Sequence, residues 1–164
     1  MRAHSINYSK VGVKMYTNIK KVCICGSGLM GSGISLLFSA NGYKTNIYAV
    51  EDSEADVRDR IKNTLNFLVE KNVLQEKQIE ISMNNVTVTD NLEEAVEGVD
   101  MVIECIPEDL KLKQDLMARL DAITDKKVIL TTNTSVISIT EIAAKTENKE
   151  RIVGTHFWNP PYLI

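Results

Sequence analysis

The chain has 164 residues, of which 44% are hydrophobic and 25% are charged, as is typical of a globular domain with a core of its own. Its formal net charge of −3 argues against a nucleic-acid-binding protein, and no apolar run in the sequence is long enough to span a bilayer. We therefore expect neither a nucleic acid nor a membrane among its partners.

The N-terminal extension comprises residues 1–18, which lack the apolar core of a signal peptide and are excluded from the predicted fold. A single predicted domain covers residues 19–164. It begins with an apolar strand over residues 21–25, followed by a glycine-rich turn and by an apolar helix from about Leu29 to residues 41–42. We expect the core face of this helix to contain Leu29, Ile34, Leu37 and Phe38.

Three glycines follow the first predicted strand in a Gly-x-Gly-x-x-Gly pattern, at positions 26, 28 and 31. Gly26 would allow a tight turn, Gly28 would let a pyrophosphate approach the backbone, and Gly31 would let the helix pack closely on the strand. The phosphates would lie against free amide groups at the helix N-terminus. Taken alone, the pattern is equally typical of a plain strand-to-helix turn.

After the first helix, strand-like and helix-like segments alternate along the chain. Short apolar or alternating runs predict strands over residues 44–49, 86–89, 100–106, 128–131 and 151–156. Helices are predicted from residue 53 onward, over 75–81, over 92–96, from 107 onward and over 138–144. This alternation predicts an α/β fold of Rossmann type, with a doubly wound, mostly parallel sheet and helices on both faces.

The spacing of residues also predicts two helix starts and two core faces. Ser53 with Asp56, and Ser138 with Glu141, are predicted capping pairs. The core faces of the two longer helices are predicted as Val57, Ile61, Leu65 and Leu68 in the first, and Leu116, Leu120 and Ile123 in the second.

Three cysteines, Cys23, Cys25 and Cys105, lie in apolar, strand-like segments. Cys23 and Cys25 are two positions apart on one strand, so they point to the same side of one backbone and are poorly placed to form a disulfide. No second Cys or His pair follows at the spacing of metal ligands. We predict buried thiols in a reducing, cytoplasmic location and no metal site.

Polar or glycine-containing clusters follow four of the predicted strands, at residues 26–31, at Glu108, at 133–135 and at 156–159. In a parallel sheet, ligands bind outside the carboxyl ends of the strands, which meet at one edge. Four clusters at one edge arise by accident far less easily than one glycine motif does. They favour a ligand site over a plain glycine-rich turn.

Four motifs occur together: Gly-Ser-Gly-Leu-Met-Gly-Ser-Gly-Ile at 26–34, Glu-Cys-Ile-Pro-Glu-Asp-Leu-Lys-Leu-Lys at 104–113, Asn-Thr-Ser at 133–135 and His-Phe-Trp-Asn-Pro-Pro at 156–161. In this combination residues 19–164 resemble the NAD-binding domain of the L-3-hydroxyacyl-CoA dehydrogenase family. The resemblance implies that NAD is the cofactor and that the substrate is a fatty acyl-CoA. The implied reaction oxidises the 3-hydroxyl of an (S)-3-hydroxyacyl-CoA to the 3-ketoacyl-CoA.

The resemblance also implies roles for individual residues. His156 matches the general base that takes the hydroxyl proton, and Ser135 matches the residue that hydrogen-bonds the substrate oxygen. The residue types suit this chemistry, because histidine can accept a proton near neutral pH and a serine hydroxyl can orient an alcohol oxygen. Glu108, Lys113 and Asn159 match positions that hold the nicotinamide and its ribose. With the glycine turn and the later turns, the candidate cofactor-binding residues are Gly26, Gly28, Leu29, Met30, Gly31, Glu51, Glu108, Lys113, Asn133 and Asn159.

These residues also have structural interpretations. His156 could be a buried histidine that ends an edge strand, and Ser135 could be a turn-forming or capping serine. Glu108 and Lys113 could be solvated charges near an exposed helix start.

The sequence departs from the family at the end of the second predicted strand. The family has an acidic residue there that holds the adenosine ribose hydroxyls, whereas this chain has Ala49. Glu51 is the nearest carboxylate and lies about 20 residues after the glycines, within the usual spacing. Either Glu51 binds the ribose through an altered loop, or the site lacks this contact and binds the adenosine end weakly. NADP preference is not supported, because no arginine follows until Arg58.

A second departure concerns the end of the chain. The family continues beyond the Asn-Pro-Pro sequence into a helical domain that supplies a carboxylate to the catalytic histidine and most of the dimer contact. We expect this chain to be the cofactor-binding half, to bind NAD and to turn over substrate poorly or not at all, and the full-length protein to be a homodimer. The alternatives are a related dehydrogenase of carnitine or a sugar acid, and a non-catalytic NAD-binding module.

Overall fold

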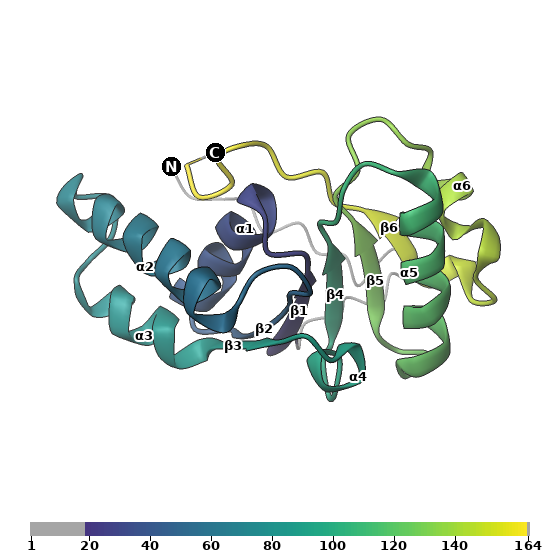
Figure 1. The fold of residues 1–164 in the computed structure, drawn as a ribbon, viewed down its shortest axis with the longest axis horizontal. Helices are drawn as coiled ribbons and strands as arrows, with labels where there is room; N and C mark the ends of the chain where they lie inside the picture. The colour runs from purple at the N-terminus through teal and green to yellow at the C-terminus, as the bar shows by residue number, and fades with distance from the viewer. Residues whose placement is uncertain (1–18, 164) are drawn as a thin grey trace, which may run out of the picture.

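Residues 19–163 are described by the structure, a computed structural model, so the predicted N-terminal extension lies outside the described residues. The strands form one parallel sheet in the order β3-β2-β1-β4-β5-β6 (Figure 1). Their bounds are Lys21–Cys25 for β1, Lys44–Tyr48 for β2, Val86–Thr89 for β3, Met101–Glu104 for β4, Ile129–Thr132 for β5 and Ile152–Gly154 for β6. The predicted Rossmann-type fold is confirmed, and its strand order changes direction between β1 and β4.

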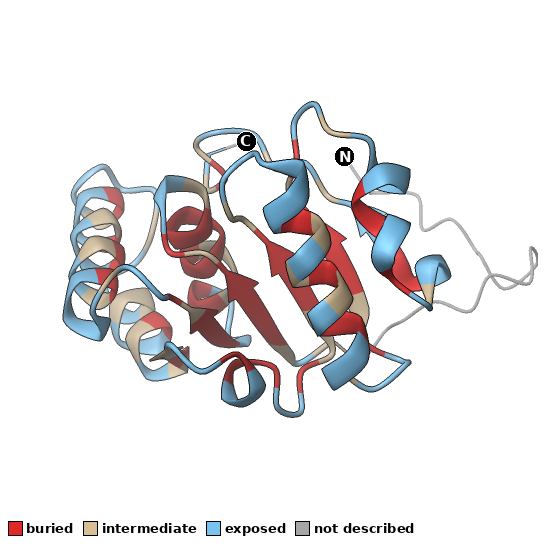
Figure 2. Ribbon diagram, turned by 45° about the vertical axis from the view of Figure 1, so that its right-hand side comes forward, coloured by how far each residue is buried: buried red, intermediate tan, exposed pale blue. Residues whose placement is uncertain are grey.

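Helices cover both faces of this sheet, as Figures 1 and 2 show. One face carries α1 (Leu29–Ala40), α2 (Glu54–Glu70) and α3 (Lys77–Asn85), and the core of the other is completed by α4 (Leu92–Ala95), α5 (Leu110–Ile123) and α6 (Ile139–Ile142). Single 3-10 turns, η2 (Ala143–Lys145) and η3 (Lys149–Arg151), lead from α6 to β6. None of the helices between residues 19 and 163 is long and apolar enough to cross a membrane.

The central strand β1 divides its side chains between these two cores. Val22 and Ile24 pack with Ile34 of α1, whereas Cys23 and Cys25 pack toward α4 and α5, as the period of two along a strand requires. The Sγ atoms of Cys23 and Cys25 are 3.9 Å apart, and both thiols are free and buried. The prediction of buried, unpaired thiols at these two positions is confirmed.

The start and the core face of α2 also agree with the sequence. Ser53 is the N-cap, and its Oγ accepts a hydrogen bond from the Asp56 amide at 3.2 Å. The four apolar side chains predicted for its core face are all buried: Val57, Ile61, Leu65 and Leu68.

The predicted core faces of α1 and α5 are partly wrong. Leu29 is 71% exposed, because it occupies the first position of α1 beside the glycine turn. In α5, Ile123 is exposed, whereas Lys113 and Met117 are buried with Leu120. Lys113 lies on the core side of α5, but a periodicity argument counts a charged residue as exposed. The buried face of α5 was therefore not fully predicted.

Two local helix predictions also need correction. The helix predicted over 75–81 is α3, which extends to Asn85 because its end is tied to α1. The Asn85 Nδ2 donates to the Ser39 carbonyl at 3.3 Å, and Ser82 Oγ is 2.6 Å from Ser39 Oγ. Ser138 is the N-cap of α6 but makes no side-chain capping bond, so the predicted capping box is not formed in this four-residue helix.

The edge strand β6 is anchored by a buried ion pair. Arg151 Nη2 lies 2.7 Å from Asp121 Oδ1, and the Arg151 Nη1 donates to the Asp125 and Val128 carbonyls at 2.8 and 3.2 Å. Burial alone would raise the pKa of Asp121, but hydrogen bonds from Arg151 and from the loop before η3 lower that pKa to about 2. This anchor fixes the strand from which residues 155–159 continue.

Candidate active site

The glycine turn between β1 and α1 requires two of its glycines for steric reasons. Gly26 has φ +110°, and a Cβ there would lie 2.7 Å from the Cys105 carbonyl oxygen. A Cβ on Gly31 would lie 1.8 Å from the Gly26 carbonyl oxygen. Gly26 therefore permits the turn beside the end of β4, and Gly31 lets α1 begin directly above the turn.

Gly28 has a different reason to be glycine. A Cβ at Gly28 would meet no atom within 4 Å, so the protein itself does not exclude a side chain there. Gly28 is the N-cap of α1, whose first turn contains no acidic residue and whose first amide groups have no carbonyl partner within the helix. An open space in front of free amides suits a pyrophosphate, so this cradle fits a dinucleotide.

Replacement by alanine should have opposite effects at Gly28 and at Gly31. Gly28→Ala should leave the unfolding temperature nearly unchanged and weaken NADH binding by tenfold or more, which is about 1.4 kcal/mol. Gly31→Ala should destabilise the fold, because its Cβ would overlap the Gly26 carbonyl. Thermal unfolding and NADH fluorescence titration of both variants measure this. Unchanged NADH affinity in Gly28→Ala would contradict a pyrophosphate site at this turn.

Two cavities adjoin at the carboxyl edge of the sheet, on either side of Met30, Cys105 and Ile106. The first, of about 420 Å³, lies over the glycine turn and the end of β2. The second, of about 470 Å³, lies over the ends of β4, β5 and β6. They flank the β1–β4 switch point, where a doubly wound sheet binds dinucleotides.

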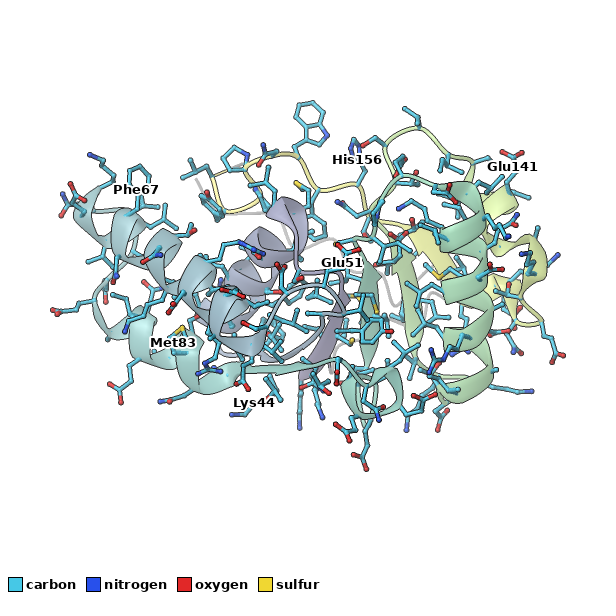
Figure 3. All side chains as sticks on the ribbon, viewed as in Figure 1. Lys44, Glu51, Phe67, Met83, Glu141 and His156 are labelled. Atoms are coloured by element: carbon cyan, nitrogen blue, oxygen red, sulfur yellow. The ribbon has the colours of Figure 1, made fainter. Side chains whose placement is uncertain are left out.

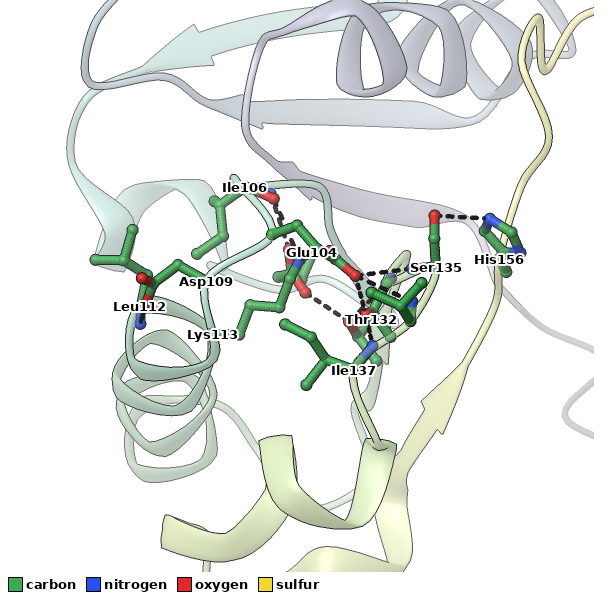
Figure 4. A network of polar contacts seen from close by, with 12 residues as sticks. Glu104, Ile106, Asp109, Leu112, Lys113, Thr132, Ser135, Ile137 and His156 are labelled. Carbon is green, nitrogen blue, oxygen red and sulfur yellow. Dashed lines mark hydrogen bonds and ion pairs between the residues drawn. The ribbon is translucent and has the colours of Figure 1, made fainter.

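A buried ion pair forms the floor beneath the second cavity (Figure 4). Lys113 from α5 and Glu104 at the end of β4 are 1% and 0% exposed, and their Nζ and Oε1 atoms lie 2.6 Å apart. Glu104 also accepts hydrogen bonds from the Ile106 amide at 2.8 Å and from Thr132 Oγ1 at 2.6 Å. These contacts join β4, β5 and α5 below the site.

Glu108 links this buried pair to the turn after β5. Its Oε2 lies 3.2 Å from Lys113 Nζ, and its Oε1 accepts hydrogen bonds from Thr134 Oγ1 and from the amides of Ser135 and Val136. Burial alone would raise the pKa of Glu108, but these hydrogen bonds outweigh it and lower the pKa to about 2. Glu108 is therefore an anion that holds the turn carrying Ser135 in place.

The loop after β6 brings His156 next to that turn. Ser135 Oγ and His156 Nε2 are 3.0 Å apart, and both side chains are exposed to the second cavity (Figure 4). The Phe157 amide donates to Asn133 Oδ1 at 2.7 Å, which ties the His156 loop to the end of β5. Asn159 lines the same cavity and precedes a cis proline.

The part of the site that should hold the adenosine contains a carboxylate that the sequence did not single out. Ala49, Glu51 and Asp52 all line the first cavity, at the end of β2. Ala49 is buried and Glu51 is exposed. In Figure 3, Glu51 lies toward the end of the molecule that carries His156, and Lys44, at the start of β2, lies at the opposite end. Asp52 is the carboxylate that is fixed here, by Ser27 and Arg60.

The structure therefore places every candidate residue except Gly31 along the two cavities. Gly26, Gly28, Leu29, Met30 and Glu51 line the first, and Met30, Glu108, Lys113, Asn133, Ser135, His156 and Asn159 line the second, while Gly31 lies beneath the turn. Sequence reasoning missed Glu104, Thr134, Asp52 and Arg60. The one available signal was Glu104, an acidic residue inside an otherwise apolar strand. Between residues 19 and 163, no three His, Cys, Asp or Glu side chains group so as to hold a metal ion.

Comparison with known proteins agrees with this geometry. Residues 21–164 match the model of the 3-hydroxyacyl-CoA dehydrogenase NAD-binding domain family. Over 144 residues the chain is 38% identical to a probable 3-hydroxybutyryl-CoA dehydrogenase of Bacillus subtilis, covering 87% of this chain and 50% of that protein. It is 34% identical over 148 residues to an L-carnitine dehydrogenase of Streptomyces coelicolor, covering 90% of this chain and 45% of that protein.

A solved structure has the same arrangement. The 3-hydroxybutyryl-CoA dehydrogenase of Escherichia coli superposes with a TM-score of 0.83 at 34% sequence identity, over 89% of this chain and 31% of that one. The chain thus spans half or less of the length of these relatives.

Proposed function

Since this chain belongs to the family of 3-hydroxyacyl-CoA dehydrogenase NAD-binding domains, we propose that it forms the cofactor-binding part of an enzyme that oxidises (S)-3-hydroxyacyl-CoA to 3-ketoacyl-CoA. Its cofactor is NAD, to which the glycine turn and the two adjoining cavities are suited. The observation that carries the catalytic proposal is the 3.0 Å contact between Ser135 and His156 at the wall of the second cavity. A base and a hydroxyl donor are thereby directed at one small volume.

Each part of the cofactor has a matching set of residues in this proposal. The amides at the start of α1 hold the pyrophosphate, and Gly28 leaves room for it. Glu108 and Asn159 hold the nicotinamide and its ribose, because their side chains line the second cavity, and Lys113 holds Glu108 in position from below through its 3.2 Å ion pair. The ionised Glu108 is an acceptor for ribose hydroxyls. NAD supplies the nicotinamide ring that accepts the hydride.

Ser135 and His156 handle the proton and the oxygen of the alcohol. A hydride can leave the carbinol carbon only as its hydroxyl proton departs, and His156 Nε2 takes that proton. Ser135 Oγ donates a hydrogen bond to the same oxygen and stabilises its developing negative charge. The Ser135 amide donates a hydrogen bond to Glu108 Oε1 at 2.9 Å, so the backbone that carries this hydroxyl is fixed before substrate binds.

A second candidate function is the oxidation of carnitine. It is supported by the L-carnitine dehydrogenase, which is 34% identical to this chain, close to the 38% of the probable 3-hydroxybutyryl-CoA dehydrogenase. The residues that handle the alcohol oxygen, Ser135 and His156, would serve either substrate. Oxidation of a 3-hydroxyacyl-CoA is the first choice, because the relatives with higher identity are named 3-hydroxybutyryl-CoA and 3-hydroxyadipyl-CoA dehydrogenase.

Reduction of alternative ketones distinguishes these functions. The purified chain is mixed with NADH and with either acetoacetyl-CoA or 3-dehydrocarnitine, and NADH consumption is followed. The chain is in excess over the ketone, so that a single slow turnover can be detected. We expect consumption with acetoacetyl-CoA. Consumption with 3-dehydrocarnitine alone would support the carnitine reaction. NADH binding without reduction of either ketone, both by this chain and by the full-length protein, would support a non-catalytic NAD-binding module.

The proposal extends to the full-length enzyme that contains this domain. We propose a homodimer that acts on an acyl-CoA in the cytoplasm. The free, buried thiols of Cys23 and Cys25 support a reducing compartment. Sedimentation of the protein in its cellular length measures the dimer directly.

A further inference from the structure

Asp52 is held in the first cavity by side chains from two other elements. It lies in the loop between β2 and α2, and its Oδ2 accepts a hydrogen bond from Ser27 Oγ at 2.6 Å. Arg60 of α2 binds the same carboxylate at two points, with Nη1 3.1 Å from Oδ2 and Nη2 3.2 Å from Oδ1. A two-point contact fixes the plane of the carboxylate as well as its position.

Arg60 also holds the backbone of the glycine turn. Its Nη1 donates to the Ser27 carbonyl oxygen, which accepts a second hydrogen bond from Ser32 Oγ at 2.6 Å. Ser27, Asp52 and Arg60 thus form one connected group, which we name the Ser27 clamp. The Asp52 and Arg60 side chains are 29% and 38% exposed, so both can still be reached by a ligand.

The clamp leaves Asp52 able to bind a hydroxyl. Its Oδ1 accepts one hydrogen bond, from Arg60, whereas a carboxylate oxygen has two lone pairs. Hydrogen bonds from Arg60 and Ser27 also hold the pKa of Asp52 below its ordinary value, which keeps it an anion. Glu51 is exposed on the same loop, and it would lose side-chain freedom on binding that Asp52 has already lost.

We propose that Asp52, rather than Glu51, is the carboxylate that binds the adenosine ribose, and that its pairing with Arg60 determines the preference for NAD over NADP. This inference rests on the proposed function. A ribose 2′-hydroxyl can donate to Asp52, whereas a 2′-phosphate would face an anion that also occupies both terminal nitrogens of Arg60. Ala49 leaves space at the strand end but adds no charge.

Removing the Asp52 charge should therefore affect the two cofactors in opposite directions. In titrations of the 164-residue chain with NADH and NADPH, Asp52→Asn should weaken NADH binding about tenfold, the loss of one hydrogen bond to a charged group. It should strengthen NADPH binding about fivefold, because the freed Arg60 gains an ion pair with the 2′-phosphate. Glu51→Gln is the matched control and should change neither affinity.

A second substitution tests whether Arg60 is the residue that receives the phosphate. Asp52→Asn combined with Arg60→Met should lose the gain in NADPH affinity. Should Asp52→Asn fail to fold by circular dichroism, Asp52→Ser replaces it with the same expectation.

Each outcome supports or overturns the inference. If Asp52→Asn only loosened the glycine turn, NADH and NADPH would both bind more weakly. Weaker NADPH binding in Asp52→Asn therefore overturns the inference. Weaker NADH binding in Glu51→Gln with no change in Asp52→Asn also overturns it and assigns the ribose to Glu51. If the unaltered chain binds NADH and selectivity does not move, this inference alone fails. If the unaltered chain binds no NADH, the proposed function fails first and takes the inference with it.

Discussion

Replacing His156 by glutamine should lower the rate of hydride transfer by about 10²- to 10⁴-fold, the contribution typical of a general base. Glutamine retains the size and polarity of the side chain but cannot take up a proton. NADH affinity should remain nearly unchanged, because the glycine turn that receives the pyrophosphate lies on the other side of Met30 from His156. The rate is measured with excess chain over acetoacetyl-CoA, and the affinity by NADH fluorescence.

Ser135→Ala is the companion variant for this experiment. It removes one hydrogen-bond donor to the alcohol oxygen but leaves His156 in place, so its rate should fall less than that of His156→Gln. Glu108 should still hold the turn, because it binds the Ser135 amide rather than the hydroxyl. The assay runs in the direction of ketone reduction, in which His156 gives its proton to the substrate oxygen, so equal rates in His156→Gln and the unaltered chain would mean that another group supplies that proton.

Replacing Lys113 by methionine should reduce the free energy of unfolding by about 3–5 kcal/mol, because the change leaves a buried carboxylate without its cation. Lys113 and Glu104 are 1% and 0% exposed and 2.6 Å apart, so Glu104 has little access to water that could replace the ammonium group. The free energy is measured by urea unfolding without cofactor.

Two further variants separate the lost partner from the lost side chain. Glu104→Gln combined with Lys113→Met should recover much of the stability, since no buried charge then remains unpaired. Lys145→Met is the matched control: Lys145 pairs with Asp115 at 2.5 Å, but both side chains are about half exposed, and the loss should be below about 1 kcal/mol. A loss in Lys113→Met no larger than that in Lys145→Met would contradict a stabilising role for the buried pair.

The sheet and the position of the site could be predicted from sequence, because both depend on short-range patterns. The alternation of strand-like and helix-like segments specifies a parallel doubly wound sheet, and residues that directly follow parallel strands must meet at one edge. The need for glycine at positions 26 and 31 could be predicted for the same reason, since it arises from the strand-to-helix turn itself. The contact of Ser135 with His156 follows from the adjacency of β5 and β6.

The remaining features depend on side-chain pairing that has no sequence period. The burial of Lys113 is possible only because Glu104, nine residues earlier, ends a buried strand beneath it. Periodicity instead treats a lysine as exposed, which made the predicted core face of α5 partly wrong. Likewise the Ser27 clamp joins a turn, a loop and a helix, and motif spacing directed attention to Ala49 and Glu51 instead.

The crystal structure of this chain with NADH would test the central claim most directly. We predict the pyrophosphate against Gly28 and the first amides of α1, and the nicotinamide ring in the second cavity within reach of His156 and Ser135. Pyrophosphate density away from Gly28, or a nicotinamide ring outside the cavity lined by His156, would contradict the account.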